Sequence, residues 1–353
     1  MSRKKVLIVT AKYFPYVGGA SIYFKEFVVD NLKKDFNFFV LTTNNFQAKQ
    51  SKLLFSIPTI ETQSPILYKL AFIWLSISSF FLTTILVLKY KIDIIHTHST
   101  SGLCFGASLA AKLWGKLLIK DLRDIKTSVI NLKFPEPNRF ICLEGSCRKY
   151  ALKHGVKKNK LVATKLPFEI PHRSIKRIIR IGNAGLASNK LKFLFLGEII
   201  KSKGIEIITN MAEDFPHYQF ILAGPFPQKR ILEKLNSAKN IIMLGKIVHS
   251  KVFELIKNID FLLLPSEHEG IPSSVIEALA MQKPIILNEK GVLKEFFKNT
   301  KGIFFSDFSK LSIQKIINSY QQIKITKNEY RKFTVSKKQY KQVLSNLYLR
   351  KRL

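Results

Sequence analysis

The most informative part of the chain is residues 264–287, which read LPSEHEGIPSSVIEALAMQKPIIL. An apolar run ends at Leu264, a polar loop follows it, a helical segment begins near Pro272, and a second apolar run ends at Leu287. Because a strand, a helix and a second strand in this order join parallel strands of one sheet, the segment predicts an α/β fold.

Two carboxylates make this segment a candidate ligand site. Glu269 follows the carboxyl end of a predicted strand, where ligands bind in open α/β sheets. Pro272 suits the first turn of a helix, so the amides of Ser273 and Ser274 are expected to be free donors at its positive end. Glu277 follows one to two turns into the helix. The pattern predicts a phosphate-bearing ligand whose sugar and ribose meet the two carboxylates.

The same alternation of apolar runs and helical segments extends over the rest of the chain. Strands are expected near residues 6–10, 38–42, 92–95, 117–119, 139–143, 192–196, 219–223, 241–244, 261–264, 284–287 and 302–304. The alternation stops between residues 165 and 189, which have the composition of a connection. We therefore predict a Rossmann-like domain at 1–168, a linker at 169–190 and a second Rossmann-like domain at 191–334.

The last residues, 335–353, are expected to form an amphipathic helix. Ser336 and Gln339 have the spacing of a capping box. Apolar side chains then recur at helical spacing, at Tyr340, Val343, Leu344, Leu347 and Tyr348. This stripe predicts that the helix packs back on the first domain.

Segment 264–287 resembles the motif of two glutamates, eight residues apart, of retaining GT-B glycosyltransferases, in particular family 4 (glycosyl transferases group 1). Other segments resemble that family in the same order: the opening strand with the glycine loop at 15–19, DIIHTH at 93–98, FLGEIIKSKG at 195–204 and DFLLLPS at 260–266. The resemblance implies a GT-B fold, in which two Rossmann-like domains have parallel sheets that face across a cleft. It also implies a C-terminal helix that crosses back to the first domain.

The resemblance implies a role for each matching residue. Glu277 would bind the ribose hydroxyls of a nucleotide, Glu269 would bind the donor sugar, and Lys203 would neutralise the pyrophosphate that leaves. Contacts of the backbone with the donor are expected from Gly18, Gly19, Ile247, Val248, Gly270, Ile271 and Ser273. Glu269, Lys203 and Arg123 form the expected catalytic group.

Three positions depart from the family pattern. Glu198 stands where the family usually has an arginine, and Gln282 stands where a glycine is common. Arg123, followed by Asp124, stands where the family often has a histidine near the reaction centre. Arg123 cannot act as a base at neutral pH, but it can bind a phosphate of the donor or acceptor.

The charge of the chain predicts an anionic partner. Its 353 residues include 58 Lys and Arg against 24 Asp and Glu, a formal net charge of +34. Nucleic acid, an anionic membrane surface and phosphorylated substrates all fit such an excess. No zinc-finger spacing, RNP-like aromatic signature or basic-region heptad accompanies the charge, so we expect no nucleic acid among the partners.

Residues 70–88 contain fourteen hydrophobic residues in nineteen, which is long enough for a transmembrane helix. A single span would place the predicted strands before and after it on opposite sides of a bilayer, so they could not share one sheet. We favour a helix that lies in the membrane interface, with Trp74, Phe80 and Phe81 near lipid. A wholly buried core helix and a spanning helix are the alternatives.

The three cysteines, Cys104, Cys142 and Cys147, are too few for a disulfide scaffold, and the N-terminus has no signal-peptide core. We therefore expect a cytoplasmic protein, peripheral on the inner face of the membrane. His96 and His98 share a face of one strand, but no further ligand lies near them in the sequence. No Asp-x-Asp motif occurs, so the resemblance implies a nucleotide-sugar substrate with no metal and no cofactor.

The resemblance implies a retaining glycosyltransferase that moves a sugar, hexosyl in type, from a nucleoside diphosphate sugar to a glycan or lipid-linked acceptor. The basic first domain and the apolar helix favour cell-surface polysaccharide synthesis, such as lipopolysaccharide, O-antigen or capsule. The alternative is a non-catalytic basic module on a degenerate GT-B scaffold that binds membrane or nucleic acid. Glu198 and Arg123 motivate that alternative.

Overall fold

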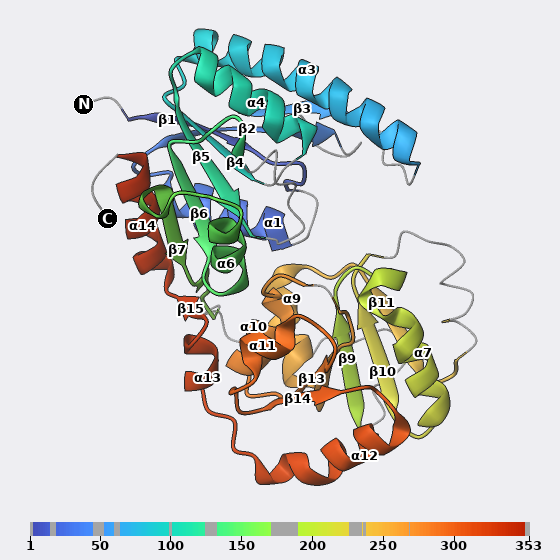
Figure 1. Ribbon diagram of the computed structural model, residues 1–353. Coiled ribbons are helices and arrows are strands. Elements are labelled where there is room, and N and C mark those ends of the chain that lie inside the picture. The colour runs from blue at the N-terminus through green and yellow to red at the C-terminus, as the bar shows by residue number, and fades with distance from the viewer. Residues whose placement is uncertain are drawn as a thin grey trace. The chain divides into compact units, whose positions relative to one another are not determined.

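The computed structural model describes residues 3–14, 19–44, 53–59, 64–98, 101–123, 133–170, 190–225, 235, 238–267 and 269–349. The chain divides into two compact units (Figure 1). The first unit comprises Met1–Phe168 together with Val335–Leu353, and the second comprises Glu169–Thr334. Most of the expected linker, residues 171–189, lies outside the described residues.

A seven-stranded parallel sheet forms the centre of the first unit, in the order β3-β2-β1-β4-β5-β6-β7. Its strands are β1 (Lys5–Val9), β2 (Asn37–Asn44), β3 (Leu54–Pro58), β4 (Ile94–His98), β5 (Leu117–Leu122), β6 (Arg139–Leu143) and β7 (Leu161–Thr164). Strand β1 is a near-continuous apolar run, and β5 is buried along its whole length, because helices cover both faces of the sheet. The sequence analysis does not predict the two edge strands, β3 and β7.

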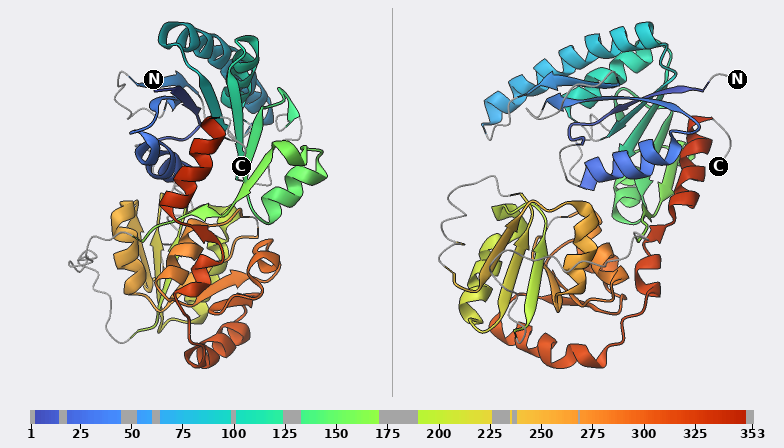
Figure 2. Two further views of the ribbon diagram at one scale, coloured as in Figure 1. Left: turned by 90° about the vertical axis from the view of Figure 1, so that its left-hand side faces the viewer. Right: turned by 180° about the vertical axis from the view of Figure 1, so that it is seen from behind.

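The two faces of this sheet are covered by different helices (Figure 2). One face is covered by a continuous helix of three parts, α1 (Gly19–Ile22), η1 (Tyr23–Val29) and α2 (Asp30–Leu32), and by α14 (Lys337–Tyr348). The other is covered by α3 (Pro65–Tyr90) and α4 (Gly102–Leu113). Helix α6 (Ser146–Lys153) and the short 3-10 helix η2 (Lys158–Lys160) complete the unit.

The first helix differs from the expected one. The sequence predicts an α-helix over residues 21–34, but the seven residues of η1 form π-helical turns. The π-helix is rare in proteins, so the sequence gives no reason to expect one here. Tyr23, the first residue of η1, makes long-range polar contacts that are described below.

The C-terminal helix α14 packs on the first unit. Ser336 and Gln339 form the predicted capping box. Tyr340, Leu344 and Tyr348 are fully buried in the core cluster that also contains Val6 of β1. Just before the helix, β15 (Thr334–Val335) pairs with β8 (Leu166–Pro167).

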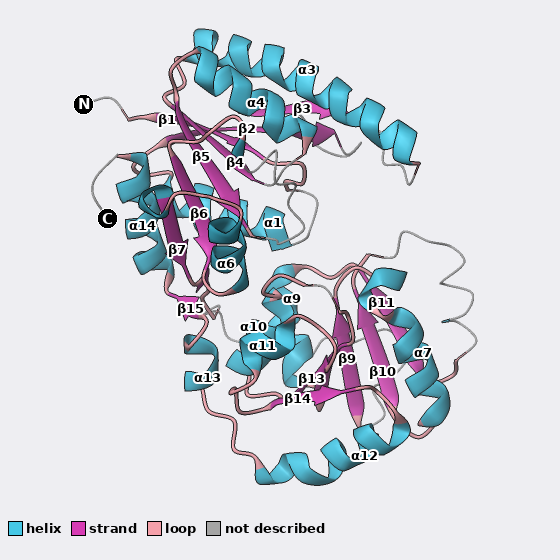
Figure 3. Ribbon diagram, viewed as in Figure 1, coloured by secondary structure: helices cyan, strands magenta, loops and turns pink. Residues whose placement is uncertain are grey.

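The second unit contains a six-stranded parallel sheet in the order β11-β10-β9-β12-β13-β14 (Figure 3). Its strands are β9 (Lys192–Leu196), β10 (Gln219–Ala223), β11 (Ile241–Gly245), β12 (Phe261–Leu264), β13 (Ile285–Asn288) and β14 (Ile303–Ser306). Its helices are η3 (Lys201–Lys203), α7 (Ile205–Asp214), α9 (His249–Lys257), α10 (Ser273–Ala280), α11 (Leu293–Phe297), α12 (Lys310–Ser319), η4 (Tyr320–Gln322) and α13 (Asn328–Arg331). The predicted α/β fold with two parallel sheets is confirmed.

Glycines allow α3 and α4 to pack closely, which yields a first prediction. A Cβ added at Gly106 would lie 1.9 Å from the carbonyl oxygen of Ser76, and backbone cannot move aside as a side chain can. We expect Gly106→Ala to lower the free energy of unfolding by about 1–3 kcal/mol, the usual cost of overpacking. Chemical denaturation would measure this loss. Gly19→Ala is the control, because a Cβ there would meet no atom of the described residues within 4 Å.

Candidate donor site and the tyrosine–arginine network

In each unit, some of the predicted site residues lie beside the point where the strand order reverses. In the second unit, β9 is followed outward by β10 on one side, while the chain restarts at β12 on the other side. Loops after two such neighbouring strands diverge at the carboxyl edge of the sheet, which is where ligands bind in open α/β folds. Lys203 follows β9 and Glu269 follows β12, so topology brings the two loops together.

Glu269 and Lys203 form an ion pair at this edge. Lys203 Nζ donates to Glu269 Oε1 at 2.5 Å, and Ser266 Oγ donates to the same oxygen at 2.7 Å. The side chains of Lys203 and Glu269 are 27% and 13% exposed, so the pair is shielded but reachable from solvent. Oε2 of Glu269 accepts no hydrogen bond from the residues that the structure describes. The carboxylate is therefore held in orientation with one oxygen available to a ligand.

Backbone contacts hold the two loops in place. Gly204 has a φ of 77°, and a Cβ there would lie 2.8 Å from Cγ of Pro265. Only glycine combines this backbone conformation with so close an approach. Asn288 Nδ2 donates to the carbonyl of Pro265 at 2.9 Å, which fixes the start of the second loop.

Helix α10 begins one residue later than expected. Pro272 has a ψ of 129° and is the N-cap residue, so the expectation that it lies in the first helical turn is wrong. The extended backbone at Pro272 turns the chain into the helix, and Ser273 is its first residue. Ser273 is exposed and Ser274 is buried. The first amides of α10 have no partner within the helix and can bind an anion, so the phosphate contact stays a prediction for this helix end.

Glu277 is buried in α10, with 3% of its surface exposed, and it pairs with a histidine that the sequence analysis misses. His249 Nε2 lies 3.1 Å from Glu277 Oε1. His249 is the first residue of α9 and follows Ile247 and Val248, the expected base-contact segment. Val248 is 56% exposed, and Ile247 is half-buried. His249 directly follows the expected base-contact segment, and this position in the sequence could have identified it as a site residue.

The remaining donor-contact residues are placed as follows. Gly270 and Ile271 are half-buried between Glu269 and α10. In the first unit, Gly19 begins α1 in the loop after β1, beside the reversal between β1 and β4. A Cβ on Gly19 would meet no atom of the described residues within 4 Å, so packing does not require a glycine there. Gly18 and Asp124 lie outside the described residues.

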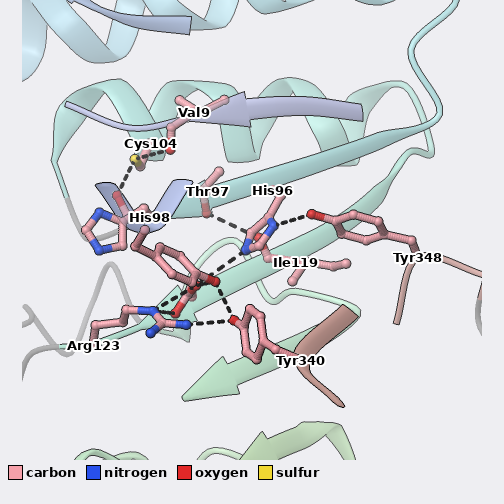
Figure 4. A network of polar contacts seen from close by, with 11 residues as sticks. Val9, His96, Thr97, His98, Cys104, Ile119, Arg123, Tyr340 and Tyr348 are labelled. Atoms are coloured by element: carbon pink, nitrogen blue, oxygen red, sulfur yellow. Dashed lines mark hydrogen bonds and ion pairs between the residues drawn. The ribbon is translucent and has the colours of Figure 1, made fainter. Parts of the chain in front are cut away.

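Arg123 follows β5 and lies in a buried network rather than at the surface (Figure 4). Its Nε donates to both oxygens of Asp121, at 3.0 and 3.2 Å, and its Nη2 donates to the hydroxyl of Tyr340 at 2.7 Å. The guanidinium carbon lies 3.5 Å from the ring centroid of Tyr23. Tyr23 donates its hydroxyl to Asp121 at 2.6 Å. Arg123 thus joins β5 to η1 and to the C-terminal helix.

Burial and neighbouring charges shift the pKa values of the ionisable groups in this network. Burial is the largest influence on Asp121 and disfavours its charged form, but Arg123, His96 and His98 together outweigh burial and hold the pKa of that carboxyl well below its usual range. Asp121 in turn holds the pKa of Arg123 above its usual value, although burial opposes this. Burial raises the pKa of Tyr23 and Tyr340, so both hydroxyls stay neutral. The network is an ion pair surrounded by neutral phenols.

The two histidines of β4 have structural partners. His96 is fully buried, and its Nδ1 lies 2.8 Å from the hydroxyl of Tyr348 on α14. The ring of His98 packs edge-on against Phe24. No group of three or more His, Cys, Asp or Glu side chains that could hold a metal ion occurs within the described ranges. Cys104, Cys142 and Cys147 are buried and form no disulfide with one another, and burial raises the pKa of Cys142 to about 12.

The chain is similar in sequence to several known proteins. Residues 178–338 match the family described as Glycosyl transferases group 1. An uncharacterized glycosyltransferase of Methanocaldococcus jannaschii is 24% identical over 303 residues, covering 80% of this chain and 78% of that protein. The N,N'-diacetylbacillosaminyl-diphospho-undecaprenol alpha-1,3-N-acetylgalactosaminyltransferase of Campylobacter jejuni is 26% identical over 306 residues, covering 77% and 78%.

A solved structure shows the same fold. The Anabaena protein HepE, in complex with UDP and glucose, superposes with a TM-score of 0.69 at 15% identity, covering 98% of this chain and 99% of that chain.

Proposed function

We propose that the chain is a group 1 glycosyl transferase, the family that residues 178–338 match, and that it is a retaining enzyme that transfers a hexosyl-type sugar from a nucleoside diphosphate sugar. The acceptor is a glycan or a lipid-linked glycan in cell-surface polysaccharide or glycolipid synthesis. The Campylobacter relative, by its name, acts on a diphospho-undecaprenol-linked sugar, which supports an acceptor of this kind.

The arrangement of Lys203, Glu269 and α10 at one sheet edge carries the proposal. A nucleoside diphosphate sugar presents an anionic diphosphate between a sugar and a ribose. The first turn of α10 and Lys203 offer positive charge to the diphosphate, while Glu269 and Glu277 offer acceptors to hydroxyl groups. Each chemical part of the donor therefore has a matching group in the second unit.

The ion pair suggests how binding prepares the reaction. Without donor, Lys203 neutralises Glu269. When the diphosphate binds, Lys203 turns its charge to the phosphates, and the carboxylate becomes free to accept hydrogen bonds from the sugar. As the bond between the sugar and the phosphate breaks, negative charge grows on the leaving diphosphate and is stabilised by Lys203 and the helix end. We propose that no metal is needed for this stabilisation.

A panel of UDP-, GDP- and ADP-sugars in a thermal-shift assay tests donor binding, because a ligand that binds only the native state raises Tm. We expect at least one donor to raise Tm and to be slowly hydrolysed. Lys203→Met should lower the rate of turnover about 100-fold, the usual loss when one charge-stabilising donor is removed. Lys201→Met is the matched control, because Lys201 lies in the same short helix and is 77% exposed.

Failure of every donor to bind or to be hydrolysed would contradict the proposal. It would favour a non-catalytic basic module on this fold. Equal loss of activity in the Lys201 and Lys203 variants would also contradict the specific role of Lys203. Activity that is lost on adding a chelator and restored by a divalent cation would overturn the metal-free part alone.

A further inference from the structure

The solvent-facing side of α3 is apolar along most of the helix. Side chains that recur at helical spacing on this side are each more than half exposed: Leu70, Ile73, Trp74, Ile77, Phe81 and Leu88. We call these residues the apolar face. Exposed contiguous apolar surface of this extent marks an interaction site in a soluble protein.

The buried side of the same helix carries hydroxyl groups among its apolar residues. Ser79 and Thr83 are fully buried against the unit, and the hydroxyl of Thr83 has no hydrogen-bond partner among the residues that the structure describes. Ser76 is half-buried at the close approach to α4. A helix that faces water normally has polar residues on its outer side. The distribution fits a helix whose outer side meets a hydrocarbon environment.

Both ends of α3 are tied to one sheet, so the helix cannot stand across a bilayer. By length and composition α3 could span a membrane, since its 26 residues extend ~39 Å. It follows β3 and precedes β4, which belong to the same parallel sheet, and it lies along α4 at the margin of the first unit (Figures 1 and 2). A helix held in this way presents its side, rather than its length, to a membrane.

Residues around the apolar face have the chemistry of an interfacial helix. The indole N–H of Trp74 donates to the carbonyl of Pro58 at 3.1 Å, so its half-exposed ring can enter an apolar environment without an unsatisfied donor. Lys69, Lys89 and Lys91 are exposed beside or just after the face. Lysines at this level attract anionic lipid head groups, and the net charge of +34 acts in the same direction.

We propose that the apolar face of α3 docks on a bilayer containing anionic lipid, with the helix axis parallel to the membrane plane. The hydrophobic side chains enter the boundary of the acyl chains, and the lysines stay at the head groups. This deepens the proposed function, on which it rests for the meaning of docking: a surface-bound enzyme would meet a lipid-linked acceptor. Docking itself requires no sugar transfer.

Cosedimentation of the full chain with vesicles tests the proposal. We expect binding to vesicles of phosphatidylcholine with phosphatidylglycerol, and weaker binding to phosphatidylcholine alone or at high salt. The double variant Ile77→Glu with Phe81→Glu should reduce vesicle binding at least about tenfold, because it places two carboxylates on the apolar face. Leu311→Glu is the matched control, because Leu311 is 63% exposed on α12 in the other unit, and it should bind as the parent does.

Two alternatives to in-plane docking, self-association of the chain and insertion of α3 across the bilayer, predict different results in these experiments. If the parent chain is a dimer in solution, and the double variant is monomeric but still binds vesicles, the face is a self-association surface and the proposal is wrong. If high salt and alkaline carbonate fail to release the bound protein, α3 inserts across the bilayer and the in-plane arrangement is wrong.

Donor binding separates this proposal from the proposed function. The double variant should keep the parent's circular dichroism and its donor-induced rise in Tm, since both substitutions are at exposed positions. Retained donor binding with no vesicle binding by the parent chain overturns only the membrane proposal. Vesicle binding with no donor binding overturns only the proposed function.

Discussion

Replacing Glu277 by glutamine should weaken nucleotide-sugar binding about 10- to 100-fold while the protein stays folded. Glutamine keeps the shape of the side chain and can still accept a hydrogen bond from His249, which lies 3.1 Å away. It lacks the negative charge that strengthens hydrogen bonds from ribose hydroxyls. Hydrogen bonds to a charged group contribute about 1.5–3 kcal/mol, which corresponds to this range of affinity.

Titration calorimetry with the donor chosen by the thermal-shift panel measures the loss. Glu295→Gln is the matched control, because the side chain of Glu295 is 83% exposed on α11 and should leave the affinity unchanged. An affinity for the donor that Glu277→Gln does not alter would remove Glu277 from the donor site. A variant with the parent's unfolding transition but no binding would instead strengthen the assignment.

Arg123→Met should destabilise the first unit by about 3–5 kcal/mol, the cost of removing one partner from a buried ion pair. The variant leaves the carboxylate of Asp121 buried without its cation, and it removes the donor that holds the hydroxyl of Tyr340. Because Tyr340 belongs to α14, we expect the C-terminal helix to lose much of its attachment. Arg139→Met, at an exposed position, should have little effect on stability.

Urea denaturation at a series of pH values tests this expectation. The direction in which stability changes with pH follows from the ionisation of Asp121. In the parent, the pKa of Asp121 is lowered in the folded state, so its contribution to stability is present above the unfolded pKa and is lost as pH falls. In the Arg123→Met variant, Asp121 has lost its cation, so burial disfavours the charged form of its carboxyl group. The difference between the free energies of unfolding of the parent and the variant should therefore become smaller as pH falls below about 4. A constant difference would contradict the ion-pair explanation.

Two further measurements separate structure from catalysis at Arg123. The variant Asp121→Asn with Arg123→Met should recover part of the lost stability, because it leaves no unpaired buried charge. The sequence analysis assigns Arg123 to the catalytic group, and its Nη1 is buried without a partner in the described part of the chain. If the double variant is stable but turns over the donor far more slowly than the parent, Arg123 also acts on the reaction.

The sequence analysis predicts the fold well where the decisive pattern is local. Apolar runs, their order and the motif at residues 264–287 predict two parallel sheets, and the capping box at Ser336 and Gln339 predicts the start of α14. The two edge strands of the first unit are missed, because β3 and β7 are mostly half-buried and their apolar runs are only two or three residues long.

The sequence by itself determined the elements, their parallel arrangement and the residue types of the candidate site, because backbone preference and the burial of apolar side chains act over a few residues. Tertiary structure alone decided which polar groups meet: Lys203 forms an ion pair with Glu269, 66 residues away, and Arg123 donates a hydrogen bond to Tyr340, 217 residues away. It also decided that the outer side of α3 is apolar. Such pairings depend on long-range contacts, which only the folded chain specifies.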